Sequence, residues 1–279
     1  MKTAVSKAVR TLLFLVGLGL CLIFFLTPVL WAIFNSFKTN DEIFSWPPTF
    51  FPHDWTLEQY TGAFEARNVP LVFSNSLIIA VLTTLFSLMI GFLAAYPMAR
   101  YHTRGYRYLL STILIGRMIP AVALAVPMHY MFTKLGLINT KPGLIICYTM
   151  FCLPFTIFLM KGFIQQIPEE IEEAAMIDGC NRSQLLGKVI LPLSTVGLGT
   201  TAIFNFLLSW NDLFFAIILT QTDRVRTIPV AITMFQTDRN TDFGQLYAFM
   251  TLAMVPVLIL AIFAQKYMVQ GLTMGAVKG

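Results

Sequence analysis

Residues 172–179 read Glu-Glu-Ala-Ala-Met-Ile-Asp-Gly and residues 189–192 read Val-Ile-Leu-Pro, between two long apolar stretches. Pro168 and the acids that follow it mark a helix start, because negative side chains favour the positive end of the helix dipole. An ordinary amphipathic surface helix would explain the acids and the alanines. It would not explain the glycine, the Leu-Pro pair downstream or the apolar stretches on both sides, so the segment predicts a more specific structure.

This segment resembles the EAA loop of ATP-binding-cassette (ABC) importer permeases, written Glu-Ala-Ala, three residues, Gly, nine residues, Ile, one residue, Leu-Pro. The matching residues are Glu173, Ala174, Ala175, Gly179, Leu191 and Pro192. Val189 stands where the family usually has isoleucine, which is a conservative departure. The resemblance implies that the segment is the coupling helix, which docks on a cytoplasmic nucleotide-binding ATPase subunit. Glu172 and Asp178 are assigned to the same joint.

Helical geometry divides this segment into two faces, since a helix has about 3.6 residues per turn. One face has small side chains that permit close approach of a partner: Glu172, Ala175, Met176 and Gly179. The adjoining face has apolar surface that needs burial: Ile171, Ala174 and Ile177, with Asp178. We expect this helix to fit into a groove of the ATPase subunit.

The composition is that of a membrane protein. Of the 279 residues, 57% are hydrophobic and 12% charged, whereas soluble domains carry about 25% charged residues. Apolar stretches and short connections use nearly the whole chain, which leaves no room for a separate soluble domain of about 100 residues. Any ATP-hydrolysing domain must therefore be on another chain. The net charge of +5 matters for sidedness in the lipid membrane, and we expect no nucleic-acid partner.

Six stretches are long enough to cross a membrane, which takes about 20 apolar residues. They are residues 11–37, 73–98, 108–132, 143–163, 195–220 and 246–267. The expected fold class is therefore an all-α membrane protein with six transmembrane helices. The first stretch follows Lys2, Lys7 and Arg10, as a secretory signal would. It is too long and lacks a small-residue cleavage site, so we interpret it as a span.

Positive charge is unequal on the two sides of these spans. Eleven Lys and Arg residues lie in the termini and the even-numbered connections, against seven on the other side. The positive-inside rule then places both termini and the EAA segment in the cytoplasm of a multi-pass protein of the bacterial cytoplasmic (inner) membrane. The predicted segments are a cytoplasmic N-terminus (1–10), the first transmembrane helix (11–37), an extracytoplasmic loop (38–70), a five-helix permease core (71–268) with the coupling loop (166–193), and a cytoplasmic tail (269–279).

The C-terminal residues 270–279 read Gln-Gly-Leu-Thr-Met-Gly-Ala-Val-Lys-Gly. They resemble the tail Gly-Leu-Thr-x-Gly-x-Val-Lys-Gly of the smaller, maltose-transporter-type permease. That resemblance implies a docking role between the ATPase subunits for Gly275, Val277, Lys278 and Gly279. A frayed terminus is the alternative.

Arg117 lies in the middle of the third apolar stretch. An ionisable group at that depth costs at least about 2.5–3.5 kcal/mol on insertion scales, so it should face protein or water. Two interpretations stay open. Arg117 pairs structurally with a carboxylate or with helix carbonyls, or it lines the substrate pathway and binds an acidic or polyhydroxylated substrate.

The fifth apolar stretch contains a polar seam: Asn205, Ser209, Trp210, Asn211 and Asp212. Asn205 and Ser209 are four residues apart and therefore share one side of a helix. The Trp-Asn-Asp sequence resembles the Trp-Asn-acid signature common in carbohydrate permeases. An aromatic face against sugar C–H groups, with amide and carboxylate hydrogen bonds, is a chemically sensible sugar contact. The alternative is a polar clamp between helices, and this alternative is weightier for Asp212 than for Asn205 or Trp210.

Sites for other chemistry are missing from the sequence. There is no Gly-x-x-x-x-Gly-Lys-Ser/Thr loop to hold ATP phosphates. The three histidines, at positions 53, 102 and 129, are dispersed and make no zinc set, and the four cysteines make no disulfide framework. We therefore expect no catalytic residue, no metal and no cofactor on this chain.

Together these features resemble a type I, binding-protein-dependent ABC importer permease of the carbohydrate family. The resemblance implies several partners: a second permease in a heterodimer, two nucleotide-binding ATPase subunits that use ATP and Mg, an extracytoplasmic solute-binding protein, and a small carbohydrate substrate. That substrate would be a sugar, a polyol or a sugar derivative.

Two other functions stay open. An ABC permease for an amino acid, a peptide or a phosphonate would share the EAA loop, but the seam at residues 210–212 and the tail favour a carbohydrate. An ion-coupled secondary carrier would have intramembrane relays and inverted repeats. Only Arg117 and Asp212 are candidates for a relay, and no convincing repeat is present.

Overall fold

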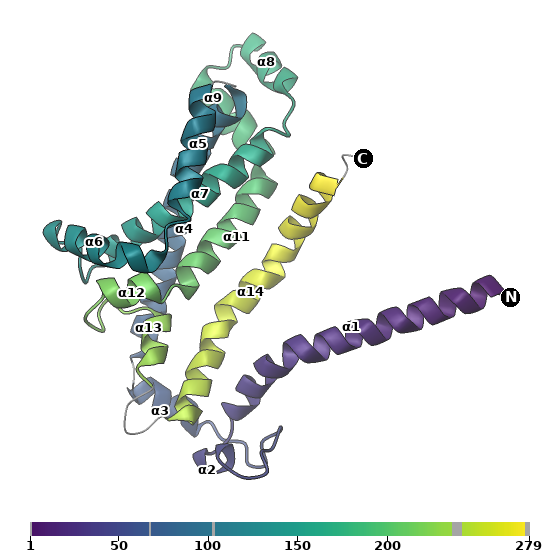
Figure 1. The fold of residues 1–279 in the computed structure, drawn as a ribbon, viewed down its shortest axis with the longest axis vertical. Helices are drawn as coiled ribbons and strands as arrows, with labels where there is room; N and C mark the ends of the chain where they lie inside the picture. The colour runs from purple at the N-terminus through teal and green to yellow at the C-terminus, as the bar shows by residue number, and fades with distance from the viewer. Residues whose placement is uncertain (1, 67, 102–103, 236–241, 277–279) are drawn as a thin grey trace. The chain divides into compact units, whose positions relative to one another are not determined.

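The computed structural model describes residues 2–66, 68–101, 104–235 and 242–276. Within these ranges all regular structure is helical, as the sequence predicts (Figure 1). The elements are α1 (Lys2–Asn35), α2 (Asn40–Ile43), α3 (Glu58–Ala66), α4 (Val69–Arg100), α5 (Arg104–Gly116), α6 (Ala121–Lys134), α7 (Lys141–Ile164), α8 (Glu169–Ile177), α9 (Arg182–Leu185), the π-helix η1 (Leu186–Ile190), α10 (Leu191–Leu193), α11 (Thr195–Asn211), α12 (Phe214–Leu219), α13 (Ile228–Thr233) and α14 (Phe243–Ala276).

Four helices of the described ranges are long and apolar enough to cross a membrane: Val9–Asn35, Val69–Arg100, Lys141–Ile164 and Phe243–Gln265. Two further candidates are pairs of helices bent at a short break. Tyr108–Gly116 and Ala121–Lys134 meet at 92°, and Arg182–Leu193 and Thr195–Asn211 meet at 76°. Each of the six predicted apolar stretches lies on described helices, but two of them are not single straight helices. The second bent pair also takes in residues 182–193 of the predicted coupling loop and ends before residue 220.

The third predicted span, residues 108–132, is wrong as a continuous helix. Regular structure stops after Gly116 and resumes at Ala121. The amides of Arg117 and Met118 close tight turns on Leu114 and Ile115. Pro120 then lacks an N–H and disfavours helical geometry in the residue before it, which forces the break.

The fifth predicted span, residues 195–220, is also interrupted. α11 ends at Asn211, and Asp212 has extended backbone angles of −70° and 118°. The Asp212 Oδ1 accepts hydrogen bonds from the amides of Phe215 at 3.0 Å and Ala216 at 3.3 Å. Because this carboxylate binds amides that have no partner within α12, it starts a new helix. The polar seam thus lies at a helix junction.

The chain forms two compact units, Met1–Val69 with Ile232–Val255 and Pro70–Ala231 with Pro256–Gly279. In the first unit, the ring of Phe34 packs on Phe50 at 5.6 Å beside the loop that follows α1. Lys38 is buried there, and its Nζ donates to the carbonyl of Thr49 and lies 5.1 Å from the Trp31 ring centroid. Burial lowers the pKa of Lys38, because the charged form loses solvation.

α7 is the central helix of the second unit. Of the 18 most apolar consecutive residues of α7, 56% are buried, against 33% for the corresponding residues of α4. It packs against α5, α11 and α12, and Figure 1 shows it alongside α11. Side chains of α7 contribute to two buried clusters. One contains Leu144 and Tyr148, and the other contains Ile157, Met160 and Ile164.

The second of these clusters connects the C-terminal half of α4 to the coupling loop. It joins Phe92 and Ala95 of α4 to Leu185 and Ile190, with Ala175 of α8 packed against it. The coupling loop is therefore seated on the body of its own unit.

Candidate functional site

The coupling loop, residues 166–193, begins with α8. Pro168 precedes this helix and three acids occupy its first turn. The helix ends at a left-handed glycine, since Gly179 has a φ of +88°. The amide of Gly179 donates to Met176 O at 3.1 Å, and the amide of Cys180 donates to Ala175 O at 3.0 Å. This pair of bonds is a Schellman motif, so the glycine of the EAA pattern is the residue that ends α8.

Glu172 points into the protein. Its Oε1 accepts from the Arg100 Nε at 2.6 Å, and its Oε2 accepts from the Tyr96 hydroxyl at 2.7 Å. The side chains of Arg100 and Glu172 are 9% and 8% exposed. Arg100 also donates from Nη2 to the carbonyl of Ile167 at 2.9 Å. Both carboxylate oxygens of Glu172 therefore bind groups of α4.

This orientation corrects the predicted use of the two helix faces. Glu172 and Ala175 lie on the face that packs against α4 and the buried cluster. The exposed residues of α8 and its end are Glu169, Glu170, Ile171, Glu173, Ala174, Met176, Ile177, Asp178 and Gly179. Ile177 is 86% exposed and Met176 is 50% exposed. The surface available to a partner is therefore the one that carries these two apolar side chains.

The rest of the coupling loop, residues 181–193, is shaped by a capped helix start and by Pro192. Asn181 and Gln184 form a capping box at the start of α9. η1 has one wide π-turn, in which the Leu191 amide donates to Leu186 O. Pro192, which is exposed like Leu191, has no N–H to continue the ladder, and a wide turn accommodates its ring. The Leu-Pro pair therefore marks where the chain bends toward α11.

A second candidate site is a cavity of about 160 Å³ in the same unit. We call it the polar cavity. Its walls come from the α5–α6 break, α7, the end of α11 and α12: Arg117, Tyr148, Phe151, Cys152, Leu208, Ser209, Asp212 and Phe215. At about 30 Å³ for each water of the liquid, the cavity has room for about five water molecules.

Opposite charges line the polar cavity. Arg117 donates from Nη1 to the carbonyl of Phe151 at 3.2 Å, and its guanidinium lies 5.5 Å from the ring centroid of Phe155. Asp212 uses one oxygen to start α12. Among the described residues, no ion pair joins Arg117 to Asp212. A guanidinium has five N–H donors, so Arg117 has donors left for a bound molecule.

Aromatic rings complete the cavity. Phe151 and Phe215 stack with centroids 4.3 Å apart at 29°. Tyr148, which is 3% exposed, lies one helical turn before Phe151 on α7. Flat rings beside charged and hydroxyl groups can contact the C–H face of a polar ligand and bind its oxygens at the same time.

Three of the six predicted pathway residues do not line this cavity. The Asn205 amide hydrogen-bonds the hydroxyl of Thr156 at 2.8 Å. Trp210 is buried and stacks on Phe206 at 5.4 Å and 16°. Asn211 is exposed and donates to Leu207 O. Arg117, Ser209 and Asp212 do line the cavity.

Sequence reasoning missed the contribution of α7. Tyr148, Phe151 and Cys152 are three and four residues apart, so they share one face of that helix. A search for polar or aromatic groups at this spacing would have found the face. It was not singled out because aromatic residues are frequent throughout the chain, which has 25 Phe and 9 Tyr.

The Asn205–Thr156 bond joins α11 to α7, and we expect Asn205→Ala to lower stability without removing a cavity residue. Hydrogen bonds between membrane helices contribute about 0.6 kcal/mol on average and up to about 1.7 kcal/mol. The Thr156 hydroxyl keeps its hydrogen bond to the carbonyl of Cys152 at 3.0 Å, so a value near the average is expected. Thermal unfolding in detergent measures the effect, with Asn211→Ala as the exposed control. An equal shift in both variants would contradict a specific role for the Asn205 amide.

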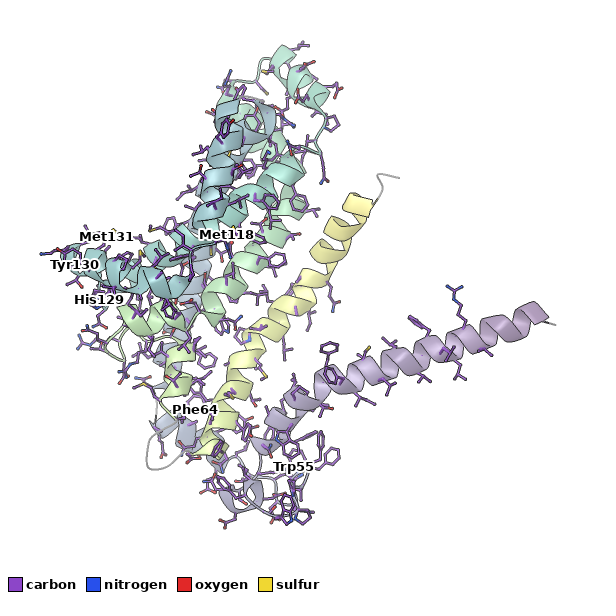
Figure 2. All side chains as sticks on the ribbon, viewed as in Figure 1. Trp55, Phe64, Met118, His129, Tyr130 and Met131 are labelled. Carbon is purple, nitrogen blue, oxygen red and sulfur yellow. The ribbon has the colours of Figure 1, made fainter. Side chains whose placement is uncertain are left out.

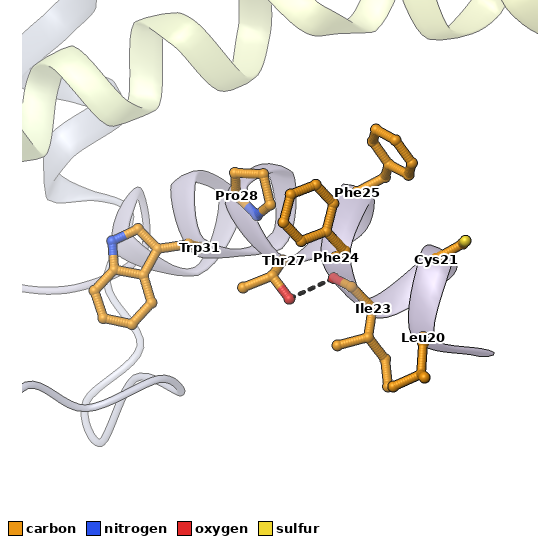
Figure 3. Close-up of a pocket in the computed structure, with 8 residues that line it drawn as sticks. All are labelled: Leu20, Cys21, Ile23, Phe24, Phe25, Thr27, Pro28 and Trp31. Carbon is orange, nitrogen blue, oxygen red and sulfur yellow. Dashed lines mark hydrogen bonds between the residues drawn. The ribbon is translucent and has the colours of Figure 1, made fainter. Parts of the chain in front are cut away.

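Other hollows are weaker candidates. Residues of α1 alone, from Leu20 to Trp31, line an apolar groove near Pro28 (Figure 3). The hydroxyl of Thr27 in this groove already donates to Ile23 O at 2.6 Å. Its remaining lining is apolar except for the Cys21 thiol and the indole N–H of Trp31. No three His, Cys, Asp or Glu side chains of the described ranges are grouped to hold a metal ion.

The outer face of α6 carries exposed apolar side chains. Val122, Val126 and Tyr130 are four residues apart and are 71%, 78% and 64% exposed. His129 lies beside Val126 and Tyr130 in an open hollow of this face. Figure 2 shows His129, Tyr130 and Met131 together at the far end of α6. This face has no cover within the described chain.

The predicted tail falls largely outside these observations. α14 runs to Ala276, so the backbone of Gly275 is helical. Val277, Lys278 and Gly279 lie outside the described residues.

Comparisons with known proteins agree with this architecture. A family model for "Binding-protein-dependent transport system inner membrane component" matches residues 87–274. The diacetylchitobiose uptake system permease protein DasC of Streptomyces coelicolor is 36% identical over 252 residues, which are 90% of this chain and 91% of DasC. The trehalose/maltose transport system permease protein MalG of Thermococcus litoralis is 35% identical over 278 residues, which are 98% and 99% of the two chains.

The fold agrees with that of a solved transporter. A chain of the bacterial ABC transporter involved in the import of the acidic polysaccharide alginate superposes with a TM-score of 0.82 at 23% identity, covering 94% of this chain and 97% of the other. The apolar spans, the coupling loop and the family match lead to one conclusion. This chain belongs to the family of binding-protein-dependent transport system inner membrane components, the non-catalytic permease subunits of ABC importers.

Proposed function

We propose that this chain forms part of the pathway by which an ABC importer moves a carbohydrate or a carbohydrate derivative across the membrane. The similar proteins from Streptomyces coelicolor and Thermococcus litoralis are named for diacetylchitobiose and for trehalose and maltose. The observation that carries the proposal is the polar cavity, where Arg117 and Asp212 flank aromatic rings. An extracytoplasmic binding protein would deliver the substrate to the outward-facing state.

The chemistry of the cavity suits a sugar. Hydroxyl pairs can accept hydrogen bonds from the planar guanidinium of Arg117 and donate to the carboxylate of Asp212. The rings of Tyr148, Phe151 and Phe215 can contact the apolar C–H faces of a pyranose. A cavity of about 160 Å³ would hold a short part of an oligosaccharide at one time. Arg117 and Asp212 are each bound to backbone groups, and the remaining donors and acceptors of both side chains suit a polar ligand or water.

Energy would come from two ATPase subunits that bind ATP and Mg. Their closure around ATP would draw the docked coupling helices together and open the pathway outward, and hydrolysis would restore the inward-facing state. The exposed Ile177 and Met176 supply apolar surface for docking, and Glu173 and Asp178 supply charge at its edge. Docking requires that the coupling loop and both termini are cytoplasmic. The tail from Gly275 to Gly279 would add a second contact with these subunits.

A second permease would cover the outer face of α6 and complete the pathway as a heterodimer. His129 lies within the stripe of Val122, Val126 and Tyr130. An ionisable side chain on an apolar face of a membrane helix is costly against lipid, so protein or water is the expected neighbour. One coupling loop per chain also calls for two permeases, since each ATPase subunit needs its own.

The test is the complete complex in proteoliposomes, assembled with its binding protein and ATPase subunits. We expect a carbohydrate-loaded binding protein to stimulate ATP hydrolysis and to produce uptake of the labelled sugar. The panel should include disaccharides, acidic oligosaccharides, polyols, amino acids and peptides, with the empty binding protein as the control. A response to an amino acid or a peptide alone would contradict the carbohydrate assignment. Uptake that follows an ion gradient without ATP would contradict the importer itself.

A further inference from the structure

The buried pair Arg100–Glu172 joins the coupling helix to a transmembrane helix of the same chain. Glu172 is on α8, and Arg100 is the last residue of α4. Because both oxygens of Glu172 and two nitrogens of Arg100 are in use, the pair is held by three hydrogen bonds with Tyr96 and the Ile167 carbonyl. Charged hydrogen bonds of this length are the strong ones, and the Arg–carboxylate geometry is directional. α8 is thus fixed to α4 through side chains.

A second contact holds the other end of the loop to the same place. Arg182 of α9 donates from Nη1 to the Tyr101 hydroxyl at 2.6 Å. Tyr101 directly follows α4, and its ring stacks on Tyr106 at 25°. Both α8 and α9 of the coupling loop therefore contact the C-terminal end of α4 or the residue that follows it. The Arg182 contact is exposed, so the buried pair is the stronger of the two.

α4 in turn meets the helices that carry the polar cavity. A Cβ at Gly91 would lie 3.0 Å from the Cβ of Thr156 and 3.7 Å from the backbone nitrogen of Ile157, so α4 and α7 approach closely there. Thr156 also holds Asn205 of α11. α7 and α11 supply Tyr148, Phe151, Ser209 and other cavity residues. Movement of α4 would therefore be passed to both walls.

We infer that Arg100 and Glu172 are positioning residues for transport, which carry movement of the docked coupling helix into α4 and from there to the polar cavity. This inference rests on the proposed docking of α8 to an ATPase subunit. It separates two neighbouring acids by function. Glu173 is exposed and available to the partner, whereas Glu172 holds the helix to its own chain.

The experiment compares Glu172→Gln with Glu173→Gln in the complete reconstituted complex. Three quantities are measured: co-purification of the ATPase subunits, ATP hydrolysis stimulated by the loaded binding protein, and substrate transported per ATP hydrolysed. In Glu172→Gln we expect assembly and hydrolysis to persist while transport per ATP falls about tenfold, within the range of typical coupling energies. In Glu173→Gln assembly should weaken, with unchanged transport per ATP in the complexes that form.

Two further variants keep the test decisive. The exchange Arg100→Glu with Glu172→Arg should recover part of the transport per ATP lost in Glu172→Gln, because it restores opposite charges. Tyr96→Phe removes one hydroxyl and keeps the ring, and should lower transport per ATP by a smaller factor than Glu172→Gln, because the bond between Arg100 and the Glu172 carboxylate remains. It serves as the variant if Glu172→Gln does not assemble.

The outcomes separate the two proposals. Unchanged transport per ATP in both Glu172→Gln and Tyr96→Phe would overturn the positioning role. The positioning role would also be overturned if, in both variants, assembly with the ATPase subunits fell by the same factor as transport. Failure of the wild-type chain to bind ATPase subunits, or to respond to a loaded binding protein, would instead overturn the proposed function before any variant is considered.

Discussion

Replacing Arg117 with alanine is expected to lower substrate transport about tenfold to a hundredfold, because a hydrogen bond to a charged group contributes about 1.5–3 kcal/mol. Arg117 is the cationic wall of the polar cavity, and its interactions with Phe151 and Phe155 leave donors unused. Basal ATP hydrolysis should be unaffected, since Arg117 lines the polar cavity and is not part of the coupling loop. Initial uptake rates over a range of substrate concentrations measure the change.

A structural role for Arg117 predicts a different pattern. If it only tied the α5–α6 break to Phe151, alanine would lower the melting temperature and reduce uptake of every substrate alike. Arg117→Lys keeps the charge but replaces the planar fork with a compact ammonium, so partial activity is expected for a substrate contact. Asn211→Ala is the matched control, a polar residue at the end of α11 outside the cavity. Equal uptake by Arg117→Ala and Asn211→Ala would reject the substrate contact.

The number and place of the apolar spans could be predicted because the hydrocarbon thickness fixes the length of an apolar helix. The helix breaks at Pro120 and Asp212 could not be predicted from the sequence. Proline occurs inside membrane helices, and α4, α7 and α14 each contain one without a break. Whether a given proline interrupts a helix depends on neighbours that satisfy the freed carbonyls. Those neighbours are set by the tertiary structure.

The coupling loop shows the same limit at the level of one side chain. Its helix start, its glycine and its Leu-Pro bend follow from local rules, and the structure has all three. The prediction that the Glu172 side chain faces a partner was wrong, because periodicity defines the faces of a helix without saying which face packs against the rest of the chain. The deciding partners, Arg100 and Tyr96, are 72 and 76 residues away in sequence. No local pattern could pair them with this acid.

The residues of the polar cavity could be predicted where a polar side chain lies in an otherwise apolar stretch. Arg117, Ser209 and Asp212 are polar groups in apolar stretches, and each lines the cavity. Asn205 stood out equally but is used between helices. A polar residue in a span therefore predicts a polar contact. The packing of α7 against α11 decides whether that residue contacts another side chain, as Asn205 does, or lines a cavity.

Substituting Gly179 with valine should separate ATP hydrolysis from transport. At a φ of +88°, a side chain with a Cβ costs about 1–2 kcal/mol, and β-branched residues are true outliers there. The Schellman bonds from Gly179 and Cys180 would open to relieve this strain. The last turn of α8 would then lose its shape, and Ile177 and Asp178 would shift. We expect transport per ATP to fall about tenfold, as 1–2 kcal/mol implies.

Gly179→Asn is the control, because asparagine adopts the left-handed conformation more readily than other residues with a side chain. Apart from its chain neighbours, no described residue lies within 4 Å of a Cβ at position 179, so volume alone does not strain the described part of the permease. If backbone geometry is what matters, asparagine should transport nearly as well as glycine and valine should not. If both variants fail equally, the side chain must collide with a docked partner. That result would place the ATPase surface against Gly179 and would replace the conformational explanation by a steric one.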